Sequence, residues 1–448
     1  MNLEWTREQV LALAPDAASA QAARALSQPG KWSGLGRNQR AVWGEQQGGG
    51  KDPYRARIDL QGPVFKCSCP SRKFPCKHCL GLFLALVEEP GFIAQAAPPA
   101  WVAEWLQKHE QGIEAKARKT ESQSTPIADP EAQVERARRR ESRVAEGLAE
   151  LALWLRDLVR QGLAMVLVQP ASFFESMAAR LVDAQAPGVA RRVRGLHGLG
   201  GSGNGRERRL LERIAQLHLL VEGYQRFESL AFETQTDIRS TIGWTVPAEE
   251  LLQGVGVRGV WKVLGRRAEL EDRLRVLRTW LWCAEESRYA LILRFAAGSQ
   301  PMDLSLVPGT EVGCDLGFFP GSVPLRALEK SRHCAPRSFA GEPLNLGLSV
   351  KASVDLVARA FVRNPWLERH PMSLRGVIPG RRGEDWLLCC TDGSAIPVAG
   401  RFKGGWELLA MSGGRPLGIF GEWDGHELHP LGAWTRDGFC DLGWVEGA

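Results

Sequence analysis

The sequence has no hydrophobic run long enough to cross a membrane. Its longest apolar stretch, LGLFLALV at Leu80–Val87, is far shorter than the ~20 residues that a spanning helix needs. The first twenty residues also lack a cationic segment ahead of an apolar one, which is the pattern of a signal peptide. We therefore expect a soluble cytoplasmic protein, in which the ten cysteines are reduced thiols or metal ligands rather than disulfides.

The chain also lacks a strong charge excess and the sequence patterns of several enzyme classes. A net charge of +6 over 448 residues permits an acidic partner but does not require one. The glycine-rich segment Gly195–Ile214 follows no predicted strand and lacks the Gly-Lys-Ser/Thr of a P-loop, so we interpret it as a loop between helices. No Ser/His/Asp or Cys/His set stands out, although such sets are assembled in space. An enzyme is therefore the least favoured of three hypotheses about function.

Length and composition predict a globular protein of several domains. The 448 residues are 44% hydrophobic and 24% charged, which is typical of folded domains. A chain of this length is too long for a single hydrophobic core. We expect an α+β multidomain protein with an N-terminal region at 1–106, a charged linker at 107–143, a helical bundle at 144–240 and a β-rich C-terminal region at 241–448, which can divide into two subdomains.

The N-terminal region predicts a β-β-α unit at about 40–90. Alternating apolar residues in RAVWGEQ, YRARIDL and VFKCSC, separated by glycine- and proline-containing turns, are typical of antiparallel strands. The following HCLGLFLALVEE has apolar residues at helical spacing and ends before Pro90.

Helical spacing dominates the middle of the chain and turn signals dominate its end. The steps from Val144 to Leu158 and from Leu210 to Tyr224 are three or four residues, which favours antiparallel bundle helices over a free coiled coil. In the last third, Asp392-Gly393 and Asp424-Gly425 lie between alternating segments and predict two hairpins. Many short strands indicate a small barrel or sandwich, with one helix over Val350–Phe361.

Four residues have the spacing of a metal site. Cys67 and Cys69 are one residue apart on a predicted strand, so their sulfurs share a face. Cys76 and His78 repeat this spacing just before the helix, after a six-residue loop with proline at each end. Three thiolates and one imidazole complete a tetrahedron and leave no open position for water, which predicts one structural Zn²⁺.

Other readings of these cysteines remain open. The Cys67-x-Cys69 spacing lacks the C-x-x-C geometry that activates a redox thiol at a helix start, and inert core thiols would not be surrounded by Pro, Lys and Arg. Cys79 could replace His78 as the fourth ligand, but we expect it to pack in the first helical turn.

The pattern Cys67-x-Cys69-x6-Cys76-x-His78, after a hairpin and before an apolar helix, resembles the SWIM-type zinc finger. All four ligand positions of that family match, over about a tenth of the chain. The resemblance implies a β-β-α fold and a module that contacts nucleic acid or proteins.

Basic residues near the finger and in the linker are candidate contact residues. Cations around the zinc ligands can offset the net charge of about −1 of a Cys3His zinc site, or attract phosphate or an acidic protein. The run at Ala137–Arg140 is either a solvated helix face or a docking patch. The candidates are Lys66, Arg72, Lys73, Lys77, Arg136, Arg138, Arg139 and Arg140.

Two further groups of residues are candidates for a chemical role. Glu422, Asp424, His426 and His429 superficially form a metal or acid–base set, but the Asp-Gly turn divides them between two strands. Cys389 and Cys390 are adjacent, so they face opposite sides of a strand and we expect them to pack.

Segments beyond the finger are similar to bacterial SWIM zinc finger proteins. They are PGSVPLRAL at Pro320–Leu328, RNPWL at Arg363–Leu367 and WELLAMSGGRPLGIFGEWDG at Trp406–Gly425. Genes of that family often neighbour a MoxR-type AAA+ ATPase and a protein with a von Willebrand A domain, and the resemblance implies a partner role with them. Our leading hypothesis is therefore a non-enzymatic zinc-binding adaptor or scaffold. The alternative is a nucleic-acid-binding regulatory protein that uses the finger and the Arg136–Arg143 basic helix.

Overall fold

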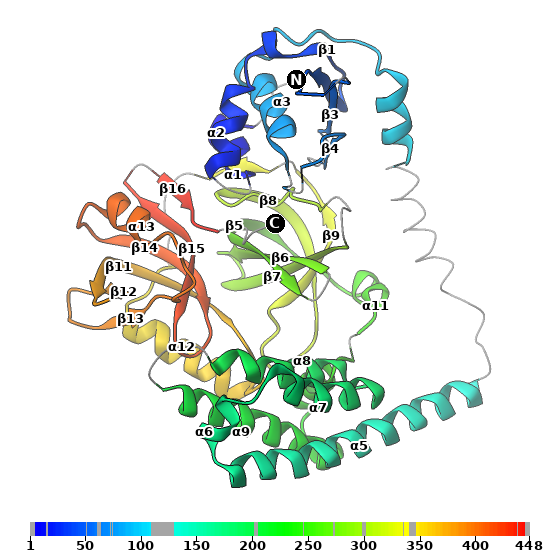
Figure 1. The fold of residues 1–448 in the computed structure, drawn as a ribbon, viewed down its shortest axis with the longest axis vertical. Coiled ribbons are helices and arrows are strands. Elements are labelled where there is room, and N and C mark those ends of the chain that lie inside the picture. The colour runs from blue at the N-terminus through cyan, green and yellow to red at the C-terminus, as the bar shows by residue number, and fades with distance from the viewer. Residues whose placement is uncertain are drawn as a thin grey trace.

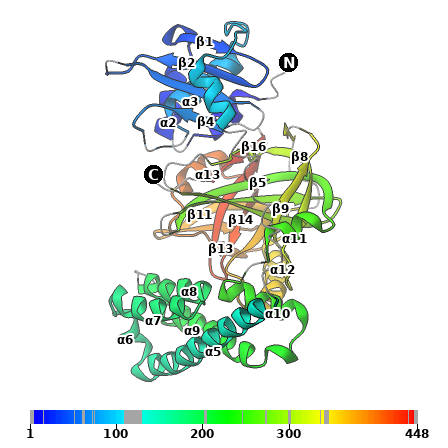
Figure 2. The same ribbon diagram turned by 90° about the vertical axis from the view of Figure 1, so that its right-hand side faces the viewer.

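A computed structural model of the chain places three units one above another along its longest axis. Figures 1 and 2 show the N-terminal unit at one end, the helical bundle at the other, and the β-rich region between them. The structure describes residues 5–14, 17–50, 52–60, 64–71, 73, 75–108, 130–200, 205–244, 246–271, 274–297, 302–334, 336–339, 346–436 and 438–443. The α+β multidomain class is confirmed.

The N-terminal unit (residues 5–108) is an antiparallel sheet packed against helices. Its elements are α1 (Arg7–Ala12), α2 (Ala17–Ala25), η1 (Pro29–Lys31), β1 (Ser33–Arg37), β2 (Ala41–Gln46), β3 (Tyr54–Asp59), β4 (Val64–Cys67) and α3 (Lys77–Glu88). The sheet order is β1-β2-β3-β4, and residues 100–108 are also helical. The strand β1 has no counterpart in the sequence prediction, because SGLGR lacks alternating apolar residues.

The bundle (residues 130–242) contains α5 (Pro130–Gln161), α6 (Leu163–Leu167), α7 (Ala171–Asp183), α8 (Pro187–His197), η2 (Gly198–Gly200), α9 (Arg206–Gln225), η3 (Phe227–Ser229) and α10 (Phe232–Ile242). The predicted seams of α5 and α9 form its core: Val144, Leu148, Leu151, Leu155 and Leu158 are buried with Leu210, Ile214, Leu217 and Val221. The predicted helical bundle is confirmed. The predicted linker 107–143 overlaps the start of α5, and its residues 109–129 lie outside the described residues.

The β-rich region begins after α11 (Ala248–Gln253) with a six-stranded sheet. Its strands are β5 (Val257–Glu271), β6 (Leu274–Cys283), β7 (Arg288–Ala297), β8 (Thr310–Phe318), β9 (Arg326–Arg332) and β10 (Arg337–Ser338). The order is β10-β8-β5-β6-β7-β9, and β9 also pairs with β8, so β8-β5-β6-β7-β9 is a closed ring of neighbours.

A second six-stranded sheet completes the chain. It contains β11 (His370–Arg382), β12 (Asp385–Cys389), β13 (Ala395–Pro397), β14 (Leu417–Trp423), β15 (Leu428–Thr435) and β16 (Gly438–Asp441), in the order β13-β12-β11-β14-β15-β16, with α12 (Val350–Arg363) and α13 (Gly405–Ser412). The hairpins predicted at Gly393 and Gly425 join β12 to β13 and β14 to β15, and both glycines have positive φ. The β-rich C-terminal region is confirmed.

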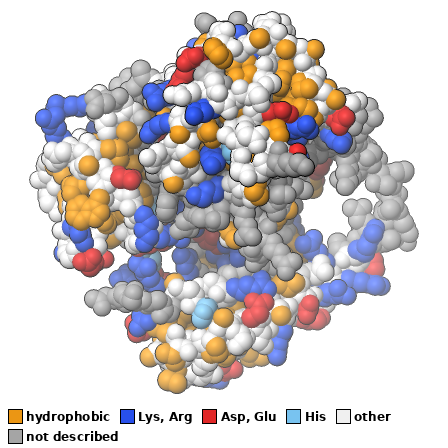
Figure 3. Space-filling view, turned by 45° about the horizontal axis from the view of Figure 1, so that its top comes forward, with side chains coloured by type: hydrophobic (Ala, Val, Ile, Leu, Met, Phe, Trp, Pro, Cys, Tyr) orange, Lys and Arg blue, Asp and Glu red, His pale blue; other side chains and the backbone are white. Residues whose placement is uncertain are grey.

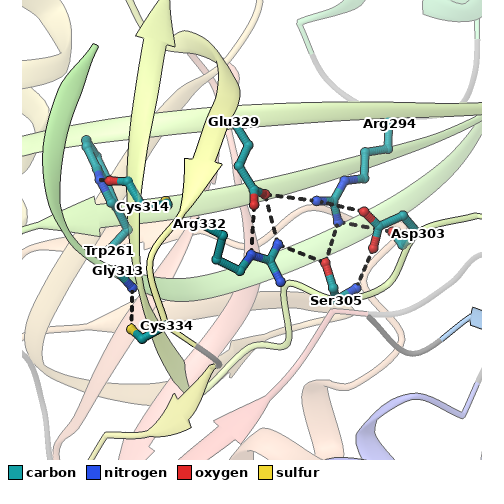
Figure 4. Close-up of polar contacts among 9 residues, drawn as sticks. All are labelled: Trp261, Arg294, Asp303, Ser305, Gly313, Cys314, Glu329, Arg332 and Cys334. Atoms are coloured by element: carbon teal, nitrogen blue, oxygen red, sulfur yellow. Dashed lines mark hydrogen bonds and ion pairs between the residues drawn. The ribbon is translucent and has the colours of Figure 1, made fainter. Parts of the chain in front are cut away.

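The N-terminal unit packs directly on the first of these sheets. Its core continues into five residues of the β-rich region: Leu277, Ala296, Met302, Leu304 and Val307. Ion pairs hold residues 302–307, the segment that carries Met302, Leu304 and Val307 (Figure 4). Arg294 lies 3.0 Å from Asp303, and Arg332 donates to Ser305 at 3.0 Å. Glu329 joins the two arginines, so residues 302–307 are fixed to β7 and β9 beneath the N-terminal unit.

The bundle docks on the opposite side of the β-rich region. The Trp366 side chain is buried in the bundle core, and its indole nitrogen donates to the Gln216 carbonyl at 3.0 Å. Glu368 accepts hydrogen bonds from Arg191 at 2.8 and 3.1 Å. Asp237 of α10 accepts hydrogen bonds from the hydroxyl and backbone N–H of Ser322. Two segments that resemble bacterial SWIM zinc finger proteins in sequence, Pro320–Leu328 and Arg363–Leu367, therefore contact the bundle through Ser322 and Trp366.

Among the described residues, the structure contains no helix with the length and apolar character required to span a bilayer.

Candidate metal centre

The four predicted ligands come together between β4 and α3. Cys67 is the last residue of β4, Cys69 follows two residues later, Cys76 is the N-cap residue of α3, and His78 lies in the first turn of that helix. One ligand atom from each residue lies within 4.8 Å of all the others. The Cys67 Sγ and the His78 Nδ1 are 3.8 Å apart. The four ligands therefore meet as predicted, but β4 ends at Cys67, so Cys69 lies beyond the strand and not on it as the sequence prediction placed it.

The site is anchored in the core of the N-terminal unit. Cys76 and His78 are 5% and 4% exposed, while Cys67 and Cys69 are half-buried. The Tyr54 ring lies 5.0 Å from the His78 ring, centre to centre, and covers the imidazole. A buried site with protein ligands on every side is what a structural metal requires.

The thiols in this group form hydrogen bonds with one another. Hydrogen bonds with neighbouring thiols, chiefly that of Cys69, raise the pKa of Cys67 far above its usual value, while such bonds stabilise the Cys76 thiolate and lower its pKa. Burial alone would lower the pKa of His78, but hydrogen bonds with Cys69 and Cys76 outweigh burial and raise it to about 9. Zn²⁺ would replace the protons that these neighbouring groups share, because a metal binds the deprotonated forms of cysteine and histidine.

Cys79 is the neighbour that sequence reasoning left as an alternative ligand. Its side chain is 1% exposed, and it belongs to the apolar core that includes Phe65 and Phe83. It interacts with Cys67 and Cys76 but is not part of the four-residue group. Cys76 and Cys79 do have the C-x-x-C spacing at a helix start, which the sequence reasoning overlooked. Because Cys79 is buried, its thiol is closed to the exchange reactions of redox pairs.

The donor set fits one structural Zn²⁺. Three sulfurs and one imidazole nitrogen satisfy tetrahedral coordination, and all four places are taken by protein. The chemistry that this site can provide is fold stabilisation: the metal would tie the end of β4 to the start of α3.

The predicted contact residues near the site are exposed. Lys66 lies on β4 opposite Arg57 of β3, and Lys73 and Lys77 flank the N-terminus of α3. Arg57 lies over the rings of Trp101 and Trp105, at 5.1 and 5.5 Å from their centroids. The predicted contact residue Arg72 lies outside the described residues.

The basic residues of α5 lie far from the finger. Arg136, Arg138, Arg139 and Arg140 are exposed on α5, at the end of the molecule opposite the N-terminal unit (Figures 1 and 2). Arg139 pairs with Glu135 at 2.9 Å, and Arg140 lies over the Trp244 ring at 4.7 Å. The two basic groups therefore form two separate surfaces, with the β-rich region between them.

Glu422, Asp424 and His426 near Gly425 have polar structural partners, and His429 packs edge-on against the Phe402 ring. Glu422 accepts from Trp280 at 2.7 Å and from Arg278 at 2.9 Å. His426 pairs with Glu212 of the bundle at 2.7 Å, and Asp424 accepts backbone N–H groups in the turn. Within the described part of the chain, the Cys3His group is the one candidate metal cluster.

Comparison with known proteins agrees with this geometry. Residues 66–87 match the SWIM zinc finger model, and residues 139–242 match the model of a SWIM-associated four-helix bundle domain. No curated protein and no solved structure shows a significant match to the chain. The matched ranges coincide with the zinc-ligand group and with the bundle. The chain therefore contains a SWIM zinc finger, followed by a SWIM-associated four-helix bundle domain.

Proposed function

We propose that this protein is a non-enzymatic zinc-binding adaptor that contacts partner proteins. The observation that carries the proposal is the exposed apolar surface of the bundle. Large apolar side chains on its helices have exposed fractions from 47% to 74%: Leu153 and Val159 on α5, Met165 on α6 with Val168 just after it, and Leu211 and Leu219 on α9. Figure 3 shows hydrophobic side chains at the surface of the bundle. Exposed apolar side chains in such numbers favour contact with protein rather than with phosphate.

The closed zinc site agrees with an adaptor role. All four ligand positions are filled by protein, so the metal offers no place for a substrate. The finger contributes instead an ordered surface, with Lys66, Lys73 and Lys77 exposed around the ligands. The proposal therefore gives the molecule two contact surfaces, one on the finger and one on the bundle.

The proposed partners are a MoxR-type AAA+ ATPase and a protein with a von Willebrand A domain. This choice depends on the resemblance of the chain to bacterial SWIM zinc finger proteins. In such an assembly the adaptor would link components without performing chemistry itself.

The test is co-purification of the full chain from its native cell, with variants on each surface. Val168→Asp and Met165→Asp should abolish recovery of the ATPase, whereas Leu270→Asp, on an exposed residue of β5 outside the bundle, should leave recovery unchanged. Equal recovery with all three variants would remove the bundle from the proposed interface. Failure of the wild-type chain to retain either partner would refute the partner assignment.

Nucleic-acid binding is the alternative, and the exposed lysines of the finger favour it. Under this alternative, affinity for a nucleic acid falls steeply with salt, and each lost phosphate contact reduces the log–log slope by about one. Lys66→Gln and Lys77→Gln should then each lower the slope. Salt-independent retention of the protein partners, with no measurable binding to single- or double-stranded DNA or RNA, supports the adaptor instead.

A further inference from the structure

A cavity of about 650 Å³ lies where the bundle meets the β-rich region. Residues of α8 and α10 line it on the bundle side, and residues 319–326 and 364–369 line it on the β side. This volume is in the range of small-molecule sites, which often form between domains.

Arginine dominates the charge of this cavity. Its charged lining residues are two acidic ones, Asp237 and Glu368, and six arginines, Arg191, Arg192, Arg239, Arg278, Arg326 and Arg369. Most of these groups already have partners. Glu368 binds Arg191 and Arg192, and Arg278 and Arg369 bind the carboxylate of Glu422 behind the cavity wall. Asp237 is engaged by Ser322.

Two arginines on facing units have no carboxylate partner among the residues that the structure describes. Arg239 belongs to α10 of the bundle, and Arg326 is the first residue of β9. Each is held over an aromatic ring instead: Arg239 over Phe227 at 4.8 Å and Arg326 over Phe319 at 4.2 Å. Burial lowers the pKa of Arg326 from its usual value, since no acidic group offsets the loss of solvent. The guanidinium nevertheless stays charged at neutral pH.

Two more donors in the wall lack acceptors. The indole nitrogen of Trp244 and the Nε of Arg192 are buried and have no hydrogen-bond partner in the described part of the chain. Both residues line the cavity. Buried donors without acceptors are uncommon and indicate a missing acceptor, such as a ligand or an ordered water.

We propose that this cavity binds a phosphorylated small molecule, no larger than a mononucleotide, whose phosphate contacts Arg239 and Arg326. A phosphate at pH 7 carries a charge of about −1.5 to −2, which matches two unpaired guanidinium groups, and arginine binds phosphate through two parallel hydrogen bonds. Trp244 and Phe319 supply apolar surface for the remainder of the ligand.

Ligand binding would couple the bundle to the β-rich region. Arg239 and Arg326 belong to different units, so a phosphate that contacts both adds a bridge to the contacts of Trp366 and Glu368. A ligand that binds only the docked arrangement stabilises it by mass action.

The experiment measures binding to the zinc-loaded full chain by titration calorimetry, with AMP, pyrophosphate and succinate as probes. AMP or pyrophosphate should bind, and Arg239→Gln and Arg326→Gln should each weaken that binding about 10- to 100-fold, the usual loss for one charged hydrogen-bond partner. Arg359→Gln is the matched control, because Arg359 is exposed on α12 and does not line the cavity. Its affinity should equal that of the wild type.

Three results would overturn the proposal. They are wild-type affinity in both cavity variants, equal affinity for succinate and pyrophosphate, or no binding of AMP and pyrophosphate at millimolar concentration. Arg239 is exposed, so its substitution should leave the fold intact even if Arg326→Gln is unstable. Partner recovery by the adaptor is measured separately, so the failure of one proposal does not imply the failure of the other.

Discussion

Replacement of Cys76 by serine should show whether this residue is a metal ligand or only a helix cap, because the two roles predict opposite changes in the stability of α3. Cys76 is the N-cap residue of α3, and its side chain makes no capping hydrogen bond. Serine is among the best N-cap residues, so Cys76→Ser in a metal-free finger should be neutral or should stabilise α3 by up to about 1 kcal/mol. If Cys76 binds zinc, the same change should instead be strongly destabilising.

The size of the loss follows from how structural zinc contributes to folding. Zinc in small fingers binds with about 10–16 kcal/mol of apparent free energy, much of which is folding free energy. An entire domain is stable by only about 5–15 kcal/mol. Loss of one of four ligands should therefore unfold the N-terminal unit, even though the bundle and the β-rich region retain their own cores.

The assay is zinc content per chain, with hydrogen exchange of α3 and β2–β4 on the same samples. Cys79→Ala is the matched control, because Cys79 is a neighbouring buried thiol outside the four-residue group. It should keep about one zinc and lose about 1 kcal/mol, as expected for a small core truncation. Full zinc content in Cys76→Ser together with zinc loss in Cys79→Ala would refute the ligand assignment.

Three other substitutions test the packing of the larger units. Glu422→Gln should lower the free energy of unfolding by about 3–5 kcal/mol at neutral pH, because Arg278 and Arg369 lose a buried carboxylate. Burial alone would raise the pKa of Glu422, but these arginines outweigh burial and lower it to about 2; the wild type should therefore lose this stability as pH falls from about 4.5 towards 2, and urea titrations should show a shallower pH dependence in the variant. Trp366→Ala should cost about 3–5 kcal/mol and speed proteolysis of α9, whereas Trp406→Ala, at a residue that is 62% exposed, should do neither. Gly432→Ala would place a Cβ 2.5 Å from the Leu264 carbonyl oxygen, where β15 packs on β5, and should lower the melting temperature; Gly400→Ala, with open space around it, should not.

The zinc ligands could be predicted from sequence because their geometry is local. Four residues within twelve positions are positioned by one strand end, one short loop and one helix start. The hairpins at Gly393 and Gly425 were predictable for the same reason, since a turn with positive φ restricts its residues to a few types.

The docking of the units could not be predicted in this way. Trp366 contacts Gln216, and Asp237 contacts Ser322, across 150 and 85 positions of sequence. No periodicity links such pairs, because the contact depends on the relative placement of complete units. The cavity arginines Arg239 and Arg326 were missed for the same reason: Arg326 lies in PGSVPLRAL, but that segment gave no sign of a binding site, and Arg239 belongs to a different unit.

The order of the units in space differs from their order in sequence, and this has a consequence for synthesis. The finger and the bundle leave the ribosome before the β-rich region that lies between them (Figures 1 and 2). Neither can therefore dock on the β-rich region until that region has been synthesised. Until β5–β7 emerge, the finger exposes the apolar surface that later covers Leu277 and Met302. A ribosome that stalls before β5 would therefore release a finger and a bundle without the β-rich region that joins them, and with apolar surfaces prone to aggregation.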